Sequence, residues 1–130
     1  MESNQQEIIM QLSMLQQQAE QYEQKLNMIN QQIVQLEELK VALDNIEDKK
    51  EILANIGKGI FVSAELKSKE LLVNIGNNIV IKKTAEETKK VIDRQVSQLS
   101  EIKSQFLMQL EETNMQLQDL VVRAQKEGKD

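Results

Sequence analysis

Few residue types in this chain of 130 residues could carry out acid–base or covalent chemistry. Histidine and cysteine are absent from the sequence, which removes the commonest general base, the thiol nucleophile and the soft metal ligands. The remaining candidates are neighbouring carboxylates at Glu37-Glu38 and Glu111-Glu112, but adjacent side chains on a helix point in different directions. The sequence therefore predicts that the protein is not an enzyme and uses neither a metal ion nor a cofactor.

Charge and hydropathy exclude further classes of protein. The segment Gly57-Lys58-Gly59 resembles the start of a phosphate-binding loop, but it leads into strand-like residues and lacks the rest of that pattern. A net charge of −5 without a dense basic stripe argues against nucleic acid and anionic lipid as partners. No secretory signal is recognisable at the N-terminus, and no apolar run approaches the roughly 20 residues that cross a bilayer. We expect a cytoplasmic protein.

Apolar residues at heptad spacing predict a long helix over the first 50 residues. Their spacings alternate between four and three, which is the pattern of a coiled-coil seam. Neither proline nor glycine occurs before Gly57, so a helix from Asn4 to about Asp48 is uninterrupted. The seam positions are Ile8, Leu12, Leu15, Ala19, Tyr22, Leu26, Ile29, Ile33 and Leu36.

The heptad register changes after Leu36 if the apolar residues alone are followed. The next ones are Leu39, Leu43 and Ile46, which places two three-residue steps in succession. Such a stammer overwinds a supercoil locally. The alternative is that the seam drifts toward a different partner in this region.

A second helical arm is predicted from Thr84 to the end of the chain. It opens with a capping box, Thr84-Ala85-Glu86-Glu87, in which the Thr84 hydroxyl accepts from the amide of Glu87 and the Glu87 carboxylate accepts in return from the amide of Thr84. Because the two arms have similar lengths, we expect them to fold back on each other as an antiparallel pair. The second seam is Ile92, Val96, Leu99, Ile102, Phe106, Leu110, Thr113, Leu117, Leu120 and Ala124.

Between the arms the apolar period falls from 3.5 to 2, which predicts β-strands over residues 51–83. Glycine and asparagine at Gly57-Lys58-Gly59 and Gly76-Asn77-Asn78 tolerate the positive φ angles of tight turns. Two β-hairpins with four strands are therefore predicted. The first strand, Glu51–Ile56, is the least determined, because its beginning could instead extend the helix.

These elements predict an α+β fold that is mainly α, a long antiparallel coiled-coil hairpin with two small β-hairpins at the base. We expect one domain over residues 1–130, divided into helices 1–50 and 84–130 and the assembly region 51–83. A lone hairpin cannot bury both faces, so the hairpins are expected to pair with copies of this chain or with a related subunit. The alternative is that they cap the end of a monomeric helical hairpin. The expected assembly residues are Ile60, Phe61, Val62, Leu72, Val73, Ile75, Ile79, Val80 and Ile81.

Apolar residues outside the seams gather toward the two ends of the chain, notably at Ile9, Met10, Met14, Val121 and Val122. Flexible, polarisable methionine on a surface suits the binding of varied apolar partners. Single exposed apolar residues are also normal in soluble proteins. The sequence pattern leaves both interpretations open.

Three stretches of the hairpin region form a recognisable set of motifs, Gly57-Lys58-Gly59-Ile60-Phe61-Val62-Ser63-Ala64-Glu65-Leu66, Val73-Asn74-Ile75-Gly76 and Lys82-Lys83-Thr84. Together they resemble the alpha class of the prefoldin family. The residues Gly57 to Leu66 are similar to its G-x-G-x-F-V-x-A-E-L strand, Val73 to Gly76 to its V-x-x-G turn, and Lys82-Lys83-Thr84 to its entry into the second helix. Beta-class subunits have a single hairpin, so the second hairpin favours alpha. The chain has Ala54-Asn55 where the family pattern has Val-Pro.

This resemblance implies an ATP-independent holdase chaperone, in which two alpha and four beta subunits form a hexamer. It implies that non-native proteins are held at the coiled-coil tips and passed to a group II chaperonin. The implied capture residues are Ile8, Ile9, Met10, Leu12, Met14, Leu117, Leu120, Val121 and Val122. The alternative function is that of a structural coiled-coil scaffold or a filament-forming relative.

Overall fold

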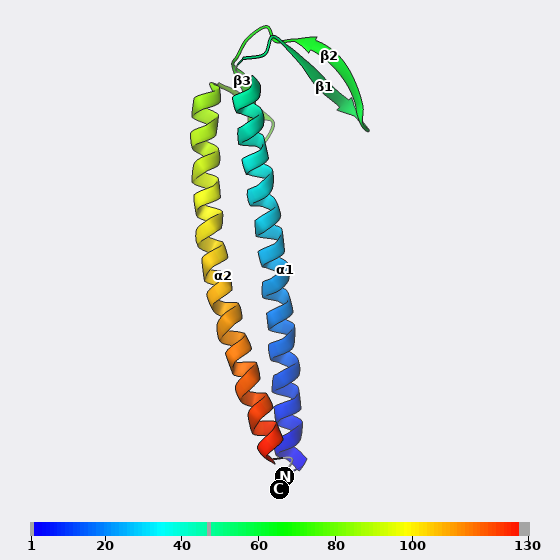
Figure 1. The fold of residues 1–130 in the computed structure, drawn as a ribbon, viewed down its shortest axis with the longest axis vertical. Coiled ribbons are helices and arrows are strands. Elements are labelled where there is room, and N and C mark those ends of the chain that lie inside the picture. Colours follow the sequence, from blue (N-terminus) through cyan, green and yellow to red (C-terminus); the bar gives the residue numbers. More distant parts are fainter. Residues whose placement is uncertain (1, 47, 128–130) are drawn as a thin grey trace. The chain divides into compact units, whose positions relative to one another are not determined.

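The computed structural model describes residues 2–46 and 48–127 and consists of two long helices with two antiparallel β-hairpins between them (Figure 1). The predicted fold class, α+β and mainly α, is confirmed. No helix in the described residues is long and apolar enough to cross a membrane. The elements are α1 (Glu2–Ile46), β1 (Glu51–Gly57), β2 (Ile60–Glu65), β3 (Leu71–Gly76), β4 (Ile79–Lys83) and α2 (Ala85–Glu127).

The chain forms two compact units, which are described separately. The terminal unit comprises residues up to Ile33 and from Gln98 onward, and the hairpin unit comprises Val34–Ser97. The first helix ends at Ile46, close to the predicted Asp48, and Glu47 lies outside the described residues. The first strand begins at Glu51, so the open question of its course is answered in favour of a strand.

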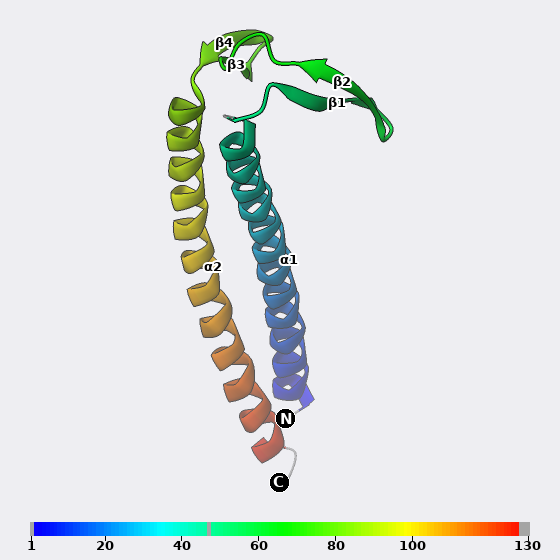
Figure 2. The ribbon, with the colours of Figure 1, turned by 45° about the horizontal axis from the view of Figure 1, so that its top comes forward.

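In the terminal unit, α1 and α2 lie side by side along the predicted seam (Figure 2). The most buried side chains are Ala19, Leu26 and Ile29 of α1 and Thr113 and Leu120 of α2. The Thr113 hydroxyl donates to the carbonyl oxygen of Gln109 at 2.8 Å, which satisfies its buried polar atom. No side chain in the described chain is less than 2% exposed, so the core is a narrow stripe rather than a globular interior.

One aromatic cluster marks the middle of that seam. The rings of Tyr22 and Phe106 lie 6.0 Å apart between their centroids, a distance at which aromatic pairs attract. The ammonium of Lys25 lies 5.3 Å from the centroid of the Phe106 ring, within the range of a cation–π interaction. Phe106 therefore joins the two helices by both dispersion and electrostatics.

Two lysines, Lys40 and Lys103, occupy seam positions that the apolar pattern assigns to the residue before each of them. Ile102 is 42% exposed and Leu39 is 46% exposed, whereas Lys103 and Lys40 are half-buried. The four–three alternation therefore continues through Lys40 to Leu43 in α1 and from Ile92 to Ala124 in α2. The stammer, one of the two alternatives for the region after Leu36, does not occur at Leu36, and the predicted seam place of Ile102 is wrong. A lysine can fill a seam position because its aliphatic stem packs while its ammonium reaches a polar partner.

Two reciprocal salt bridges join the helices in the hairpin unit. Lys40 of α1 pairs with Asp93 of α2 at 2.7 Å, and Asp44 of α1 pairs with Lys89 of α2. Asp44 lies four residues after Lys40 on α1, whereas its partner Lys89 lies four residues before Asp93 on α2. The two pairs therefore require antiparallel helices. The hydrogen bond and charge of Asp93 raise the pKa of Lys40 above its usual value. The contribution of Lys40 to stability is therefore complete below the usual lysine pKa and is lost as the pH rises through the raised pKa.

Reversing one charge of this pair is expected to lower the melting temperature more than reversing both. Asp93→Lys alone places two ammonium groups together, while Asp93→Lys combined with Lys40→Asp restores the attraction. Thermal unfolding followed by circular dichroism measures the two single variants and the double variant as a cycle. Strictly additive shifts in melting temperature would contradict the pairing.

The two hairpins repeat one local sequence and one turn. Residues Leu53–Val62 and Leu72–Ile81 align without a gap, and both contain Leu, Asn-Ile-Gly and Ile at matching places. In each, the asparagine side-chain oxygen accepts from the glycine amide two residues later, at 2.8 Å for Asn55 and 2.9 Å for Asn74. The register of strand pairing also shifts at the matching place in each hairpin, just before Gly57 in the first and just before Gly76 in the second. The hairpins are thus two copies of one structural unit.

The turn residues explain why these positions are glycine and asparagine. Gly57 and Gly76 have φ angles of 132° and 113°, which residues other than glycine rarely adopt. The two residues that follow have positive φ in both turns, as a type I′ turn requires. Asparagine fills both places in the second turn, whereas Lys58 has φ of 51° in the first.

Lys58→Asn is therefore expected to stabilise the protein slightly. Lysine in the left-handed region costs about 1 kcal/mol, and asparagine lowers that cost by hydrogen bonding locally. Urea unfolding would show a higher midpoint with an unchanged slope. Asn77→Lys, at the matching place in the other turn, should lower the midpoint by a similar amount, and equal midpoints for both variants would refute this explanation.

The start of α2 follows the predicted cap in part. The amide of Glu87 donates to the Thr84 hydroxyl at 3.1 Å, and the amide of Thr88 donates to the Thr84 carbonyl at 3.0 Å. The reciprocal bond from Thr84 to the Glu87 carboxylate does not occur among the described residues. Glu86 and Glu87 in the first turn also favour the positive end of the helix dipole.

Candidate functional site

The candidate sites are apolar surfaces rather than clusters of reactive groups. In the described part of the chain no three Asp or Glu side chains are placed to hold a metal ion. By contrast, many large aliphatic side chains are half or more exposed in both units. Exposed apolar side chains that gather in one region mark places where a protein binds another.

At the terminal unit, the predicted capture residues divide into two groups. Leu120 is buried and Ile8, Leu12 and Leu117 are half-buried, because all four belong to the helix–helix seam. The other five are exposed, and we refer to them as the tip patch. They are Ile9 (64% exposed), Met10 (65%), Met14 (64%), Val121 (44%) and Val122 (49%).

Both helices contribute to the tip patch, on two sides of the seam. If Leu15 and Leu120 are taken as d positions of the heptad, Ile9 and Val121 are both e positions, which flank the same side of an antiparallel pair. Met14 instead lines a groove of about 400 Å³ on the other side. The Leu15 and Leu120 side chains also line this groove, together with Gln11, Gln18, Gln116, Asp119 and Arg123.

This groove combines an apolar strip with amide side chains. Three of its lining residues are glutamines, one from the second helix and two from the first. A glutamine amide both donates and accepts hydrogen bonds, so it can satisfy the backbone of an extended peptide of any sequence. The arrangement suits binding of an unstructured apolar segment without sequence specificity.

In the hairpin unit, each hairpin has one half-buried face and one exposed face. The register pairs Ile52 with Ala64 on the half-buried face of the first hairpin, and Val73 with Ile81 on that of the second. The opposite faces carry large apolar side chains in solvent, among them Phe61 at 55% and Val80 at 54% exposure. Phe61 and Val80 occupy matching places in the two repeats.

Seven of the nine predicted assembly residues are exposed, and Val73 and Ile81 are half-buried. Two large apolar residues of β1, Leu53 and Ile56, are not among the predicted positions, although they are 69% and 66% exposed. The internal repeat would have revealed them, because they match Leu72 and Ile75 of the second hairpin. Both of those residues were already among the predicted positions.

Strand edges add to what the hairpin surfaces offer. Within the described residues each hairpin is a sheet of only two strands, so every strand has one edge without a neighbour in the sheet. Unpaired edges can accept a strand from another chain. The hairpin unit therefore presents both apolar faces and backbone hydrogen-bonding groups to a partner.

Comparison with known proteins gives one consistent likeness. A family model described as prefoldin subunit matches residues 15–130. A relative named prefoldin subunit alpha, from Methanosphaera stadtmanae, is 30% identical over 88 residues, which cover 66% of this chain but only 64% of that relative. The cryo-EM structure of filamentous PFD from Methanocaldococcus jannaschii has the same fold, with a TM-score of 0.75 at 18% identity, covering 86% of this chain and 96% of that one.

Proposed function

Since this chain belongs to the prefoldin family, a family of chaperones, we propose that it is an ATP-independent holdase subunit of the alpha class. The tip patch and the adjoining groove capture exposed apolar segments of non-native proteins. The observation that carries this proposal is the exposure of five aliphatic side chains where α1 begins and α2 ends. These side chains are not part of the buried core of the terminal unit, which the seam supplies.

The hairpins assemble the complex under this proposal. Partner subunits of the prefoldin beta class cover the exposed hairpin faces and pair with the free strand edges, in a hexamer of two alpha and four beta chains. The complex works in the cytoplasm and delivers its clients to a group II chaperonin. The doubled hairpin supports this arrangement, because two copies of one structural unit allow one chain to contact two partners in the same way.

Co-expression with a prefoldin beta subunit tests the proposal. We expect one closed complex by light scattering, and suppression of client aggregation at near-stoichiometric ratios without ATP. Failure of the purified complex to reduce light scattering by a chemically denatured client would refute the holdase function. Failure to bind any beta subunit, with holdase activity intact, would refute only the proposed partner.

The alternative is a structural scaffold or filament. The free strand edges of the hairpins favour it, since edges can also pair between copies of the same chain. Under this alternative, the chain alone would give open-ended species whose mass grows with protein concentration. A beta subunit would then have no effect on that mass.

A further inference from the structure

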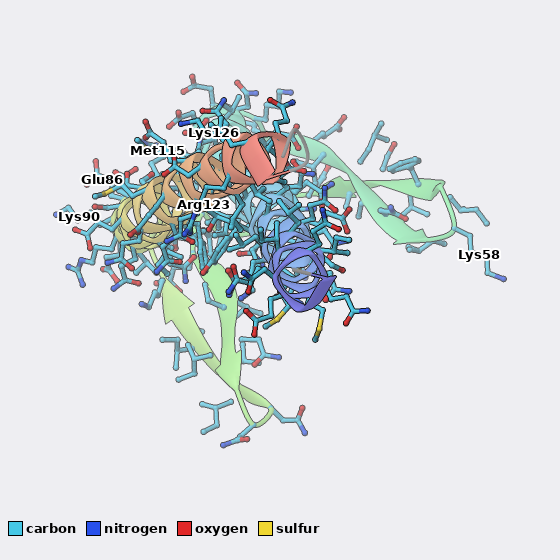
Figure 3. The ribbon with its side chains drawn as sticks, turned by 90° about the horizontal axis from the view of Figure 1, so that it is seen from below. Lys58, Glu86, Lys90, Met115, Arg123 and Lys126 are labelled. Atoms are coloured by element: carbon cyan, nitrogen blue, oxygen red, sulfur yellow. The ribbon has the colours of Figure 1, made fainter. Side chains whose placement is uncertain are left out.

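The outer side of α2 in the terminal unit carries an apolar row that the seam does not use. Met108, Met115 and Val122 are spaced seven residues apart, at f positions of the heptad, and are 70%, 61% and 49% exposed. Figure 3 shows Met115 on the side of α2 away from α1. A row with a period of seven matches the spacing of side chains on a neighbouring helix.

Between the two methionines the surface is hollowed. A depression of about 490 Å³ is lined by Met108, Glu111, Glu112 and Met115, together with Gln105 and Gln109. The four residues at i, i+3, i+4 and i+7 are the four corners of the hole that accepts a knob from a facing helix in a coiled coil. In this structure the hole faces solvent, since α1 packs against the other side of α2.

The corners of this hole carry both apolar and negative groups. The methionines lie at its two ends along the helix axis, and Glu111 and Glu112 lie at its sides. Neither glutamate forms a salt bridge with another residue in the described part of the chain. A complementary partner thus has an apolar side chain at the centre and positive charges beside it.

We propose that this hole, Met108–Glu111–Glu112–Met115, docks an amphipathic helix of a partner protein whose apolar stripe is flanked by Lys or Arg. The spacing of the methionines favours a helix over an extended segment. Residues one heptad apart on a helix are separated by about 10 Å, whereas successive residues on the same side of an extended chain are only about 7 Å apart. The two glutamates select a basic flank and disfavour acidic helices. This surface is separate from the groove on the other side of the seam.

Synthetic helical peptides of about three heptads test the proposal. One peptide has Leu at a and d and Lys at the flanking e and g positions, and a second has Glu at those flanks. Fluorescence anisotropy is measured with the full chain. We expect the Lys-flanked peptide to bind, and both Glu111→Lys/Glu112→Lys and Met108→Gln/Met115→Gln to weaken it by at least about tenfold. The charge-reversed variant should gain binding of the Glu-flanked peptide.

Two matched variants separate this site from general effects. Glu37→Lys/Glu38→Lys makes the same change in net charge at another exposed carboxylate pair, and Met28→Gln removes an equally exposed methionine of α1. Both should bind the Lys-flanked peptide like the original chain. Equal losses in these controls, no effect of the methionine changes, or no binding at all would each overturn the proposal. Self-association blocked by Met108→Gln/Met115→Gln would also overturn it, in favour of a second copy.

Discussion

Under the proposed holdase function, replacing Ile9, Met10 and Met14 with glutamine is expected to abolish most of the protection of a non-native client. Each of these side chains is about two thirds exposed, so together they offer apolar area whose burial contributes about 3 kcal/mol or more. Losing that free energy would lower the affinity for the client by about a hundredfold or more. Glutamine keeps the helix, because it is a good helix former of similar length.

A matched variant shows whether position or mere apolar exposure is responsible. Met28, Val34 and Val41 lie on the same helix and are 60%, 52% and 57% exposed. Their replacement with glutamine should leave client protection unchanged in a light-scattering assay. Both triple variants should melt within a few degrees of the original chain, since exposed substitutions have small effects on stability. Equal loss of protection in the two variants would contradict a localised tip patch.

The seam was predictable because its signal is long and redundant. From Ile8 to Leu36, each apolar residue at a or d is supported by neighbours three and four residues away, and every one is half-buried or buried in the structure. The prediction failed where lysine replaces an apolar seam residue, at Lys40 and Lys103. Hydrophobicity alone assigns the seam position to the nearest apolar residue. In the helix pair the spacing of the seam does not change, so the lysine stays at the seam position and packs its aliphatic stem there.

The hairpins were predictable from turn chemistry, but their outward faces were not. Glycine and asparagine located both turns, and the strands followed from alternation. Alternation alone does not say which face packs against the rest of the unit, so Leu53 and Ile56 were missed although they are the most exposed apolar residues of β1. The sequence repeat shared by the hairpins shows which residues of β1 face outward, because Leu53 and Ile56 align with Leu72 and Ile75 of the second hairpin.

The salt bridges near the hairpins follow from tertiary geometry that no local pattern contains. Lys40 and Asp44 are four residues apart on α1, and Lys89 and Asp93 are four residues apart on α2. Within each helix these look like ordinary i,i+4 pairs. The structure pairs them across the helices instead, because the antiparallel register brings each lysine to the opposite aspartate.

Phe61→Glu together with Val80→Glu is expected to prevent assembly with partner subunits while leaving the chain folded. The two residues occupy the same place in the two hairpins, on the faces that are exposed in the structure. Burying each apolar side chain at an interface contributes about 1.5–3 kcal/mol, and an unpaired buried carboxylate would cost more than that. Each single variant should weaken assembly and the double variant should abolish it.

Light scattering of the co-expressed subunits measures this effect, and circular dichroism checks that the helices remain. Asn78→Asp is the control, since it adds one negative charge at a hairpin turn where aspartate tolerates the φ of 60°. It should assemble normally, because the turn lies beyond the strand faces. If only one of the two single variants weakened assembly, the hairpins would not be equivalent. The repeated sequence would then reflect a shared turn and not a shared way of binding partners.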